Sequence, residues 1–500
     1  AFAQPGITDI GDRRELFVDR ALIDRLAGGA SLRLHHPEPR ETVLVHDAPW
    51  EGTGSGYHSV FQDGGLYRMY YKAYHLDVSS GKLKADAHPG YCCYAESDDG
   101  LRWRKPALNL VDFRGSTANN IVLASGPFQG LDLDAAHPAI LKDDNPAAPA
   151  EARYKAIIRS ADRKAHGLLA LRSPDGLRWS PLSSAPVLTN GAFDSQNLAF
   201  WDPVRKEYRA YWRAFTGGVT TGETWKPAGI RAIRTGTSAD FVHWDRGQDL
   251  RYVASPAEQL YTNQVKPYHR APHLLIGFPT RYLEREWSPS LRALPEREHR
   301  ERRSAASQRY GTAITEALLM ASRDGVLFHR WNEAFLRPGV ERPGTWNYGH
   351  QYIAWHLVET RSPLAGAPNE LSLYASESYW TGTSSEVRRY ALRLDGFVSA
   401  QAGYDGGELV TRLLRFAGGE LHLNFATSAA GGIRVELQGA DGRALPGFAA
   451  ADCDEVFGDA VDRLVSWKGS ADVSRLAGQP VRLRFVLKDA DLYAFQFARA

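Results

Sequence analysis

Two aspartates stand where the sequence could place an acid–base pair. Asp134 lies three residues before His137 and Asp194 lies three residues before Asn197, so the two occupy equivalent places ahead of apolar strands. Hydrolysis of a glycosidic bond needs one carboxyl group that donates a proton and a second that is ionised. We therefore predict that Asp134 and Asp194 act together, the alternative being that each caps the turn before its strand.

Three glutamates extend this candidate set. Glu51 lies in a glycine-rich loop, where it is either directed toward the site or exposed to solvent. Glu377 has aromatic neighbours that favour a raised pKa and an acid role, although an ion pair with Arg388 or Arg389 is the alternative. Glu316 is a reserve candidate, because it could simply begin a strand. The predicted catalytic residues are Asp134, Asp194, Glu377 and Glu51.

Polar and aromatic residues near the same strand starts form the predicted substrate-binding set. They are Tyr57, His58, His137, Gln196, Tyr268, Arg270, Trp346, His350 and Trp380. Imidazole and amide groups can hydrogen-bond to sugar hydroxyls, and the tryptophans offer faces for stacking. Arg270 could clamp a carboxylate, a sulfate or hydroxyl groups, or it could form a structural ion pair.

The elements that must position these residues repeat along the chain. Four segments share a Ser, one further residue, an Asp, usually a Gly, and an aromatic residue six positions after the Ser. They begin at Ser97, Ser173, Ser238 and Ser322. An Asp-Gly pair favours a tight hairpin turn, and the aromatic residue packs back under it. We interpret these segments as hairpins on the outer strands of large propeller blades.

A second series consists of polar residues that lead into an apolar strand, which ends in a turn and is followed by another strand. Its members begin at Tyr57, His137, Asp194, Tyr268 and Tyr348. Five members predict an all-β fold with a five-bladed β-propeller. The starts of the inner strands converge on the propeller axis, so the candidate residues should share one small volume.

The pattern changes after Asp395-Gly396-Phe397. Alternating apolar strands then follow one another with turns about every eight to twelve residues, which is typical of a β-sandwich. We expect a propeller catalytic domain over residues 1–397 and a C-terminal β-sandwich over residues 398–500. The segment 284–309 is rich in Arg and Glu and predicts a solvated insertion in blade four, or a mobile rim over the site.

This architecture resembles that of glycoside hydrolase families 32 and 68, and the propeller alone resembles family 43. The segment Asp99-Gly100-Leu101-Arg102-Trp103 and the tail from Arg393 to Phe495 also resemble uncharacterised bacterial proteins described as family-32-like. The resemblance implies glycoside hydrolysis. The chain departs from family 32 in having no Asn-Asp-Pro-Asn-like nucleophile segment and no Glu-Cys acid, so fructan specificity is not implied.

Histidines are numerous at the predicted strand starts, and they allow a second interpretation. Imidazoles from several blades could hold a single divalent metal on the axis, an arrangement similar to that of oligogalacturonide lyases built on larger propellers. The candidates are His58, His137, His273 and His350. We favour hydrogen bonding to sugar over metal binding, and on that interpretation no cofactor is required.

Composition excludes some classes of partner. With 60 basic and 58 acidic side chains the formal net charge is +2, and no basic groove for nucleic acid stands out. No apolar run is long enough to span a membrane. The first residues, Ala1-Phe2-Ala3-Gln4, resemble the end of a signal-peptide cleavage region, so we expect an exported, periplasmic or extracellular protein. The three cysteines are expected to be buried thiols.

Three functions agree with these patterns. The first is an exo-acting glycoside hydrolase that releases a terminal sugar, furanosidic or acidic, from an oligosaccharide or polysaccharide. The second is a polysaccharide lyase, in which a His or Tyr base acts with Arg270 or a metal. The third is a glycan-binding protein without catalytic activity.

Overall fold

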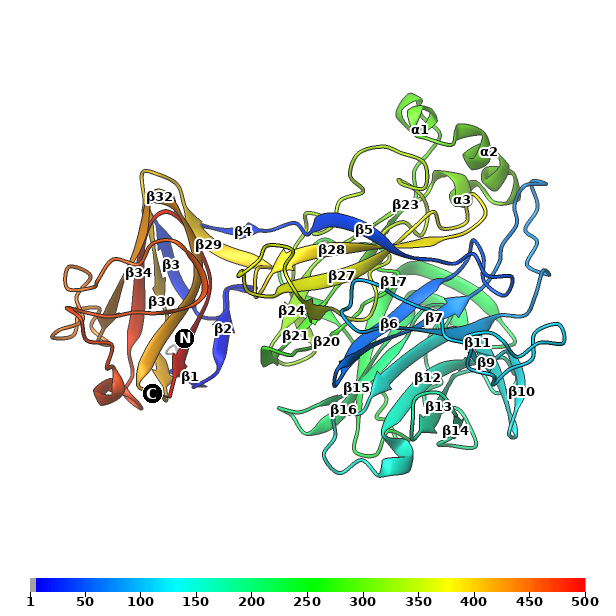
Figure 1. Ribbon diagram of the computed structural model, residues 1–500, viewed down its shortest axis with the longest axis horizontal. Coiled ribbons are helices and arrows are strands. Elements are labelled where there is room, and N and C mark those ends of the chain that lie inside the picture. The colour runs from blue at the N-terminus through cyan, green and yellow to red at the C-terminus, as the bar shows by residue number, and fades with distance from the viewer. Residues whose placement is uncertain (1–5, 500) are drawn as a thin grey trace.

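The computed structural model describes residues 6–499 and shows a nearly all-β protein built of two units (Figure 1). A ring of five sheets forms a β-propeller, and a smaller β unit that carries both ends of the described chain lies beside it. No helix among the described residues is long and apolar enough to cross a membrane. The segment Ala1-Phe2-Ala3-Gln4 lies outside the described residues.

The first three blades are antiparallel sheets whose strands follow one another along the chain. Blade one contains β6 (Gly56–Asp63), β7 (Leu66–Ala73), β8 (Tyr91–Ser97) and β9 (Ile121–Ala124). Blade two contains β10 (Gly126–Phe128), β11 (Leu131–Lys142), β12 (Tyr154–Ser160), β13 (Leu168–Ser173) and β14 (Ser180–Pro181), with the short helix η1 (Ala150–Ala152) before β12. Blade three contains β15 (Leu198–Asp202), β16 (Glu207–Thr220), β17 (Trp225–Ser238) and β18 (Gln248–Asp249).

The last two blades complete the ring, and an early strand closes it. Blade four contains β20 (Lys266–Tyr268), β21 (Ala271–Gly277), β24 (Met320–Ser322), β25 (Leu327–Arg330) and β19 (Arg251–Tyr252). Blade five contains β26 (Val358–Thr360), β27 (Glu370–Glu377), β28 (Glu386–Arg393) and β5 (Glu38–Val45). Because β5 pairs with β28 and leads directly into blade one, the two ends of the propeller are joined by backbone hydrogen bonds. The predicted five-bladed propeller is confirmed.

The repeated Ser-Asp turns have one geometry in the first four blades. The Ser97 hydroxyl oxygen accepts a hydrogen bond from the Gly100 amide at 2.9 Å, and Asp99 accepts from the Arg102 amide at 2.8 Å. The Trp103 indole then donates to the Gly100 carbonyl at 3.1 Å. These turns follow β8, β13, β17 and β24, in the outer part of their blades, as the sequence predicted.

The Arg- and Glu-rich segment forms helices between two strands of blade four. The two-stranded sheet of β22 (Thr280–Leu283) and β23 (Ile314–Ala317) carries α1 (Pro289–Ala293), α2 (Arg297–Ala306) and α3 (Gln308–Thr312). We call these three helices the helical insertion. It is anchored on a blade-five loop, where Glu296 accepts hydrogen bonds from Thr381 and from the Gly344 amide. The insertion is therefore packed against the propeller on one side, and it is not wholly solvated.

The C-terminal unit is built of one continuous hydrogen-bonded sheet and a small parallel pair. The sheet contains β2 (Arg14–Leu16), β3 (Ile23–Ala27), β4 (Ser31–Leu34), β29 (Val398–Ala402), β30 (Gly407–Thr411), β32 (Glu420–Gln438), β33 (Asp459–Leu464) and β34 (Arg482–Ala498). The parallel pair is β1 (Thr8–Gly11) with β31 (Leu414–Phe416), and the short helix η2 (Ser474–Leu476) precedes β34. Long β32 and β34 contribute to one core together with the other strands.

This arrangement changes the predicted domain division. Residues 1–397 were assigned to the propeller, but β3 pairs with β30 and β4 pairs with β29, so residues 8–34 belong to the C-terminal unit. The predicted sandwich strands therefore need N-terminal partners. A local strand pattern does not encode which distant strand it will pair with, and for this reason the division could not be read from the pattern.

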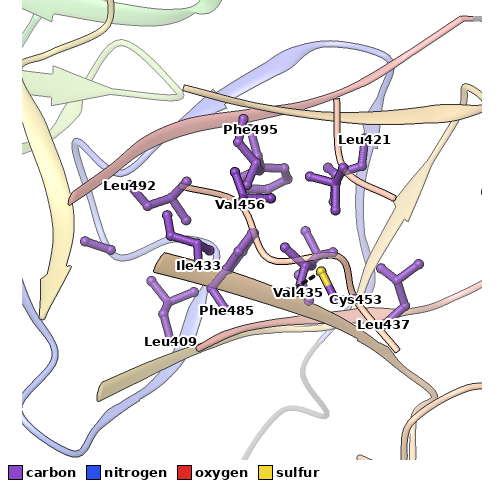
Figure 2. Packing of buried hydrophobic residues seen from close by; sticks show 14 of the residues in the cluster. Leu409, Leu421, Ile433, Val435, Leu437, Cys453, Val456, Phe485, Leu492 and Phe495 are labelled. Atoms are coloured by element: carbon purple, nitrogen blue, oxygen red, sulfur yellow. Dashed lines mark hydrogen bonds between the residues drawn. The ribbon is translucent and has the colours of Figure 1, made fainter. Parts of the chain in front are cut away.

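A dense apolar core holds the C-terminal unit together (Figure 2). Its labelled side chains include Leu409, Leu421, Ile433, Val435, Leu437, Cys453, Val456, Phe485, Leu492 and Phe495. Cys453, Cys92 and Cys93 are all buried free thiols, as predicted.

Candidate functional site

Asp134 and Asp194 meet on a single histidine. His137 Nδ1 lies 2.8 Å from Asp134 Oδ2, and its Nε2 lies 3.2 Å from Asp194 Oδ1. Asp134 and His137 belong to the first part of β11 in blade two, and Asp194 precedes β15 in blade three. The imidazole therefore bridges two neighbouring blades. We call Asp134, His137 and Asp194 the axial cluster.

Two arginines extend the axial cluster. Arg159 Nη1 lies 3.4 Å from Asp134 and 3.6 Å from Asp194, while Arg213 Nη2 lies 3.8 Å from Asp194. Arg213 is almost fully buried and its Nε donates to the Ala192 carbonyl, so its position is fixed. In contrast, 48% of the Asp194 side chain is exposed. Asp194 is thus the carboxylate of the cluster that solvent or a substrate reaches most easily.

The charges set the protonation states of the cluster. Burial alone would raise the pKa of Asp134, but His137 and Arg159 outweigh it and lower that pKa to about 2. Burial also opposes ionisation of Asp194, yet the hydrogen bond from His137 and the charge of Arg213 lower its pKa below 3.8. For His137, burial lowers the pKa, whereas the two aspartates raise it above 6.5. The cluster therefore holds two carboxylates and an imidazolium in mildly acidic solution.

Buried amides join the blades next to the cluster. Gln196 Nε2 donates to the Tyr57 carbonyl at 2.9 Å, and Gln264 Nε2 donates to Gln196 Oε1 at 2.8 Å and to the Ile353 carbonyl at 2.7 Å. Blades one, three, four and five thus meet through these groups. Gln196, which the sequence assigned to substrate, is almost fully buried in this network and holds the strand starts together.

Tyrosines form one wall beside the axial cluster. The buried rings are those of Tyr57, Tyr261, Tyr282, Tyr348, Tyr352 and Tyr379, with Tyr310 and Trp380 partly buried against them. The Tyr57 ring lies 5.8 Å from the His137 ring, so this wall adjoins the cluster. Lys72 is enclosed within the wall, where its Nζ donates to the Tyr379 hydroxyl oxygen at 3.0 Å. Tyr57 and Trp380 therefore lie where a sugar bound at the cluster could contact them.

Several residues of this region were missed by the sequence analysis, although a signal exists. Lys72, Arg159 and Arg213 each follow two apolar or aromatic residues in the second long strand of their blade, in β7, β12 and β16. Strands that pair with the inner strands bring these cations to the same end of the propeller. An apolar-apolar-cation pattern repeated in three successive blades would have identified them.

The start of blade four was placed at the wrong end of its inner strand. Tyr268 ends β20 and His269-Arg270 forms the turn to β21, so the true start is the segment that contains Tyr261 and Gln264. An aromatic residue three positions before Gln marks the starts in blades three, four and five. The pairs are Phe193 with Gln196, Tyr261 with Gln264, and Tyr348 with Gln351.

Tyr268 and Arg270 consequently have a structural role. Arg270 Nε and the Tyr268 hydroxyl both donate to Asp395 Oδ1 at 2.8 Å, and Arg14 lies 3.3 Å from the same carboxylate. Asp395 is fully buried at the junction of the propeller and the C-terminal unit. The prediction that Tyr268 and Arg270 bind substrate is therefore wrong, because burial of the Asp395 charge requires these partners.

The predicted glutamates are also engaged elsewhere. Glu51 is buried, accepts a hydrogen bond from the Tyr71 hydroxyl at 2.5 Å and lies 2.6 Å from Lys105 Nζ. Glu377 is paired with Arg388 at 2.7 Å and with Arg342. The structure gives Glu377 the ion pair that was the alternative to an acid role, and the two arginines lower its pKa although burial opposes them.

Glu316, the reserve candidate, lies within β23 and is paired with Arg281 at 2.6 Å. None of the three glutamates is in contact with the axial cluster among the ion pairs and hydrogen bonds of residues 6–499. Each of the three glutamates is instead paired with a lysine or an arginine away from the axial cluster.

The histidines proposed for a metal lie in separate environments. His58 Nε2 is 3.1 Å from His46 Nε2, and burial lowers the pKa of His58 to about 3. His350 Nδ1 accepts a hydrogen bond from the Trp346 amide at 3.0 Å, and its pKa is likewise lowered to about 3 by burial. His273 Nε2 lies 3.2 Å from Glu15.

His137 remains between its two aspartates, apart from these three. Within residues 6–499 no group of three or more His, Cys, Asp or Glu side chains could hold a metal ion. The structure therefore does not bring His58, His137, His273 and His350 together as the alternative metal site requires, because each imidazole is held by a different partner.

The two predicted tryptophans differ in position. Trp380 packs on Tyr379 and Tyr348, with ring centroids 5.3 and 4.8 Å apart, and so adjoins the tyrosine wall. Trp346 instead packs against Leu291 and its neighbours below the helical insertion, where its indole donates to the Gly339 carbonyl. Only Trp380 is placed to contact a sugar at the cluster.

Two hollows in the protein lie away from the axial cluster. One, of about 670 Å³, is lined by Asp19, Arg323 and Trp331 between blade four and the C-terminal unit. Another, of about 570 Å³, is lined by Lys266, Glu359 and other residues of all five blades at the far ends of the inner strands. Among the described residues that line them, neither hollow brings two carboxylates onto one histidine, so the axial cluster is the stronger site for acid–base chemistry.

The fold and this cluster define a five-bladed β-propeller protein in which two aspartates meet on one histidine where the inner strands begin. No known protein-family model matches the chain, and no curated protein matches its sequence.

Solved structures resemble the chain in fold at low sequence identity. It is similar to a glycoside hydrolase family 43 arabinoxylan arabinofuranohydrolase from Bacillus subtilis, with 12% identity and a TM-score of 0.42 over 91% of this chain and 97% of that chain. It is also similar to a glycosyl hydrolase from Bacteroides ovatus, with 13% identity and a TM-score of 0.37 over 74% of this chain and 96% of that chain.

A third similar structure is an N-acetylgalactosamine deacetylase from F. plautii in complex with blood group B trisaccharide. It shares 12% identity with a TM-score of 0.40, over 73% of this chain and 94% of that chain. Likeness at this level concerns the fold, and the chemistry of this chain must follow from its own side chains.

Proposed function

We propose that the protein is a glycoside hydrolase that acts at the axial cluster on an oligosaccharide or polysaccharide. One observation carries this proposal: the ionised, half-exposed carboxylate of Asp194 lies 3.2 Å from Nε2 of a histidine whose pKa is raised. A glycosidase needs a proton donor and a base that flank the glycosidic bond to be broken. The axial cluster offers both groups side by side.

The roles differ from those of a carboxylate pair. Asp134 and Asp194 both have lowered pKa values, so neither is the protonated carboxylic acid that the sequence analysis expected. In the proposed reaction the bound sugar separates Asp194 from Nε2 of His137, so that Nε2 donates its proton to the departing sugar oxygen while Asp194 accepts a proton from the attacking water. Asp134 acts as a positioning residue, because its contact with Nδ1 keeps His137 protonated and oriented.

These protonation states favour hydrolysis over elimination. A lyase needs a neutral or anionic base that removes the proton next to a uronate carboxylate. His137 is held protonated, and burial raises the pKa of the Tyr379 hydroxyl well above 10. Burial likewise raises the pKa of Tyr57, the tyrosine beside His137, well above 10. His137, Tyr57 and Tyr379 are therefore in the wrong protonation state to act as the base of a lyase.

Release of a terminal sugar is part of the proposal. The ring of Tyr310 in α3 packs on the ring of Trp380, with centroids 4.9 Å apart. The helical insertion and the blade-five loop therefore enclose the tyrosine wall on one side. A bounded site supports binding of a chain end more readily than passage of an internal segment.

The test is a panel of neutral, furanose-rich, uronate-containing and sulfated oligosaccharides, with products identified by mass. We expect release of a hydrated monosaccharide, and Asp194→Asn and His137→Gln should each lower kcat about 10²- to 10⁴-fold. Asp47→Asn is a matched control, because Asp47 is 70% exposed and lies outside the cluster. Wild-type turnover by Asp194→Asn would refute the proposal, and so would products lighter by one water or binding without turnover.

A further inference from the structure

Arg303 of α2 is a buried cation without a partner. Its exposed fraction is 0%, and its Nε, Nη1 and Nη2 atoms have no hydrogen-bond acceptor among residues 6–499. Burial of an unpaired charge is costly, and natural proteins almost always pair such groups. Arg303 therefore needs an explanation that packing alone does not supply.

The neighbouring charges do not compensate Arg303. Arg300 on the same helix donates instead to the Pro295 and Thr345 carbonyls. Glu296 accepts hydrogen bonds from Thr381 and from a backbone amide, and it forms no ion pair with Arg303 within the described chain. Burial and the charge of Arg300 lower the pKa of Arg303 to about 10, although the nearby charge of Glu296 opposes them in part. A bound anion would remove this imbalance.

Trp380 packs beside Arg303 and against the tyrosine wall. Its ring centroid is 6.0 Å from Arg303 Cζ, and its indole Nε1 also lacks an acceptor among residues 6–499. The turn that carries Trp380 is strained, because Ser378 and Trp380 both have left-handed backbone conformations with φ of 54° and 59°. Trp380 itself is only partly buried.

A second cation lies across Tyr379 from Arg303. Only 6% of Lys72 is exposed, and its ammonium group donates a hydrogen bond to the Tyr379 hydroxyl oxygen. No carboxylate of the described chain lies within ion-pair distance of it, and its Nζ is 4.7 Å from the Tyr57 ring centroid instead. Lys72 and Arg303 thus give this side of the site an excess of positive charge.

We propose that Arg303 and the Trp380 indole form a subsite for the anionic group of an acidic sugar, a carboxylate or a sulfate ester. The inference rests on the proposed hydrolase function and specifies its substrate class. A guanidinium group offers two parallel N–H donors, which match the paired oxygens of a carboxylate or sulfate. Lys72 adds attraction for the same group over a short range.

The test is calorimetric titration of sodium sulfate, galacturonic acid and neutral galactose into the full chain. The variants are Arg303→Met, which keeps bulk without charge, and Arg302→Gln as a matched control. Arg302 is an adjacent arginine of the same helix with 54% of its side chain exposed. We expect sulfate or galacturonic acid to bind wild type and Arg302→Gln, and Arg303→Met to weaken that binding about tenfold or more.

The preferred ligand identifies the anionic group, since sulfate and galacturonic acid are titrated separately. Without anion, Arg303→Met should unfold at an equal or higher temperature than wild type, because an unpaired buried charge is removed. Equal anion binding by wild type and Arg303→Met, or equal weakening by Arg302→Gln, overturns the subsite. If Arg303→Met does not fold, Trp380→Phe decides, because it keeps an aromatic ring but removes the indole N–H donor of the subsite. Trp380→Phe should weaken sulfate binding, and unchanged affinity overturns the proposal.

Failure of the subsite and failure of the proposed function give different results. Efficient hydrolysis of neutral oligosaccharides, with no preference for acidic ones, contradicts the subsite and leaves the hydrolase intact. Anion binding that depends on Arg303, without turnover of any glycan, contradicts the hydrolase and leaves the subsite intact.

Discussion

Replacement of Asp134 by Asn tests the charge state of the axial cluster. The pKa of Asp134 falls from 3.8 to about 2, and one pKa unit corresponds to about 1.4 kcal/mol. The ionised carboxylate therefore contributes about 2 kcal/mol to the free energy of unfolding, with 21% of its side chain exposed. Unfolding entropy of about 2.1 cal/mol/K per residue over a propeller of roughly 360 residues converts this to a fall in Tm of about 3 °C.

The sign of the pH dependence follows from both partners. Asp134 has a lowered pKa, so its contribution is present above pH 3.8 and is lost as the pH falls through about 2. His137 has a raised pKa, so its contribution is complete below pH 6.5 and is lost as the pH rises through its folded-state value. The effect of Asp134→Asn should be largest between about pH 4 and 6.5 and should decrease at higher pH as His137 loses its proton, because Arg159 is then the cation that still faces Asp134.

The assay is thermal unfolding of wild type and Asp134→Asn at pH 5.5 and pH 9. Glu377→Gln is the matched control, because Glu377 is paired with two arginines whose guanidinium groups stay charged across this range. The Tm loss of Glu377→Gln should therefore be the same at both pH values. A loss for Asp134→Asn that is equally independent of pH would refute the reasoning, because His137 would then not be an imidazolium.

Two further predictions concern residues that the structure assigns to stability. Arg270→Ala should lower the free energy of unfolding by about 3 kcal/mol, because Asp395 stays buried with fewer partners, while kcat/KM changes less than about twofold; a large change in KM would return Arg270 to the substrate site. Gln264→Leu should cost about 1–3 kcal/mol, measured as a lower Tm, because the Gln196 side chain and the Ile353 carbonyl lose their donor. An unchanged Tm would contradict the role of this amide in joining the blades.

The repeated turns made the fold predictable from the sequence. Each Ser-Asp turn is stabilised by hydrogen bonds among residues at most three positions apart, as at Ser97 and Asp99, so its geometry is encoded locally. Counting five strand starts gave five blades. The predicted start of blade four lies at the wrong end of its inner strand. The apolar pattern around Tyr268 fits either end of this short strand, and only the pairing with β21 decides between them.

The candidate site was predictable in part. Asp134 and Asp194 stand at equivalent positions of successive blades, and the ring symmetry of a propeller is enough to bring such positions together. That His137 would bridge them was not encoded in the spacing, because it depends on the distance between two blades. Lys72 and Arg213 were missed because a single cation in a strand does not reveal its role, and only comparison of the same strand in successive blades shows the repeated pattern.

The sequence by itself therefore determined the turns, the number of blades and the two aspartates, all of which depend on contacts within a few residues or on the repeat. Only the tertiary structure decided the partners of buried charges. Glu51 is paired with Lys105 and Arg270 with Asp395, across many residues of chain, and residues 8–34 pair with strands near the C-terminus. A buried charge must find an opposite charge wherever the folded chain supplies one, so its partner is set by proximity in space and not by position in the sequence.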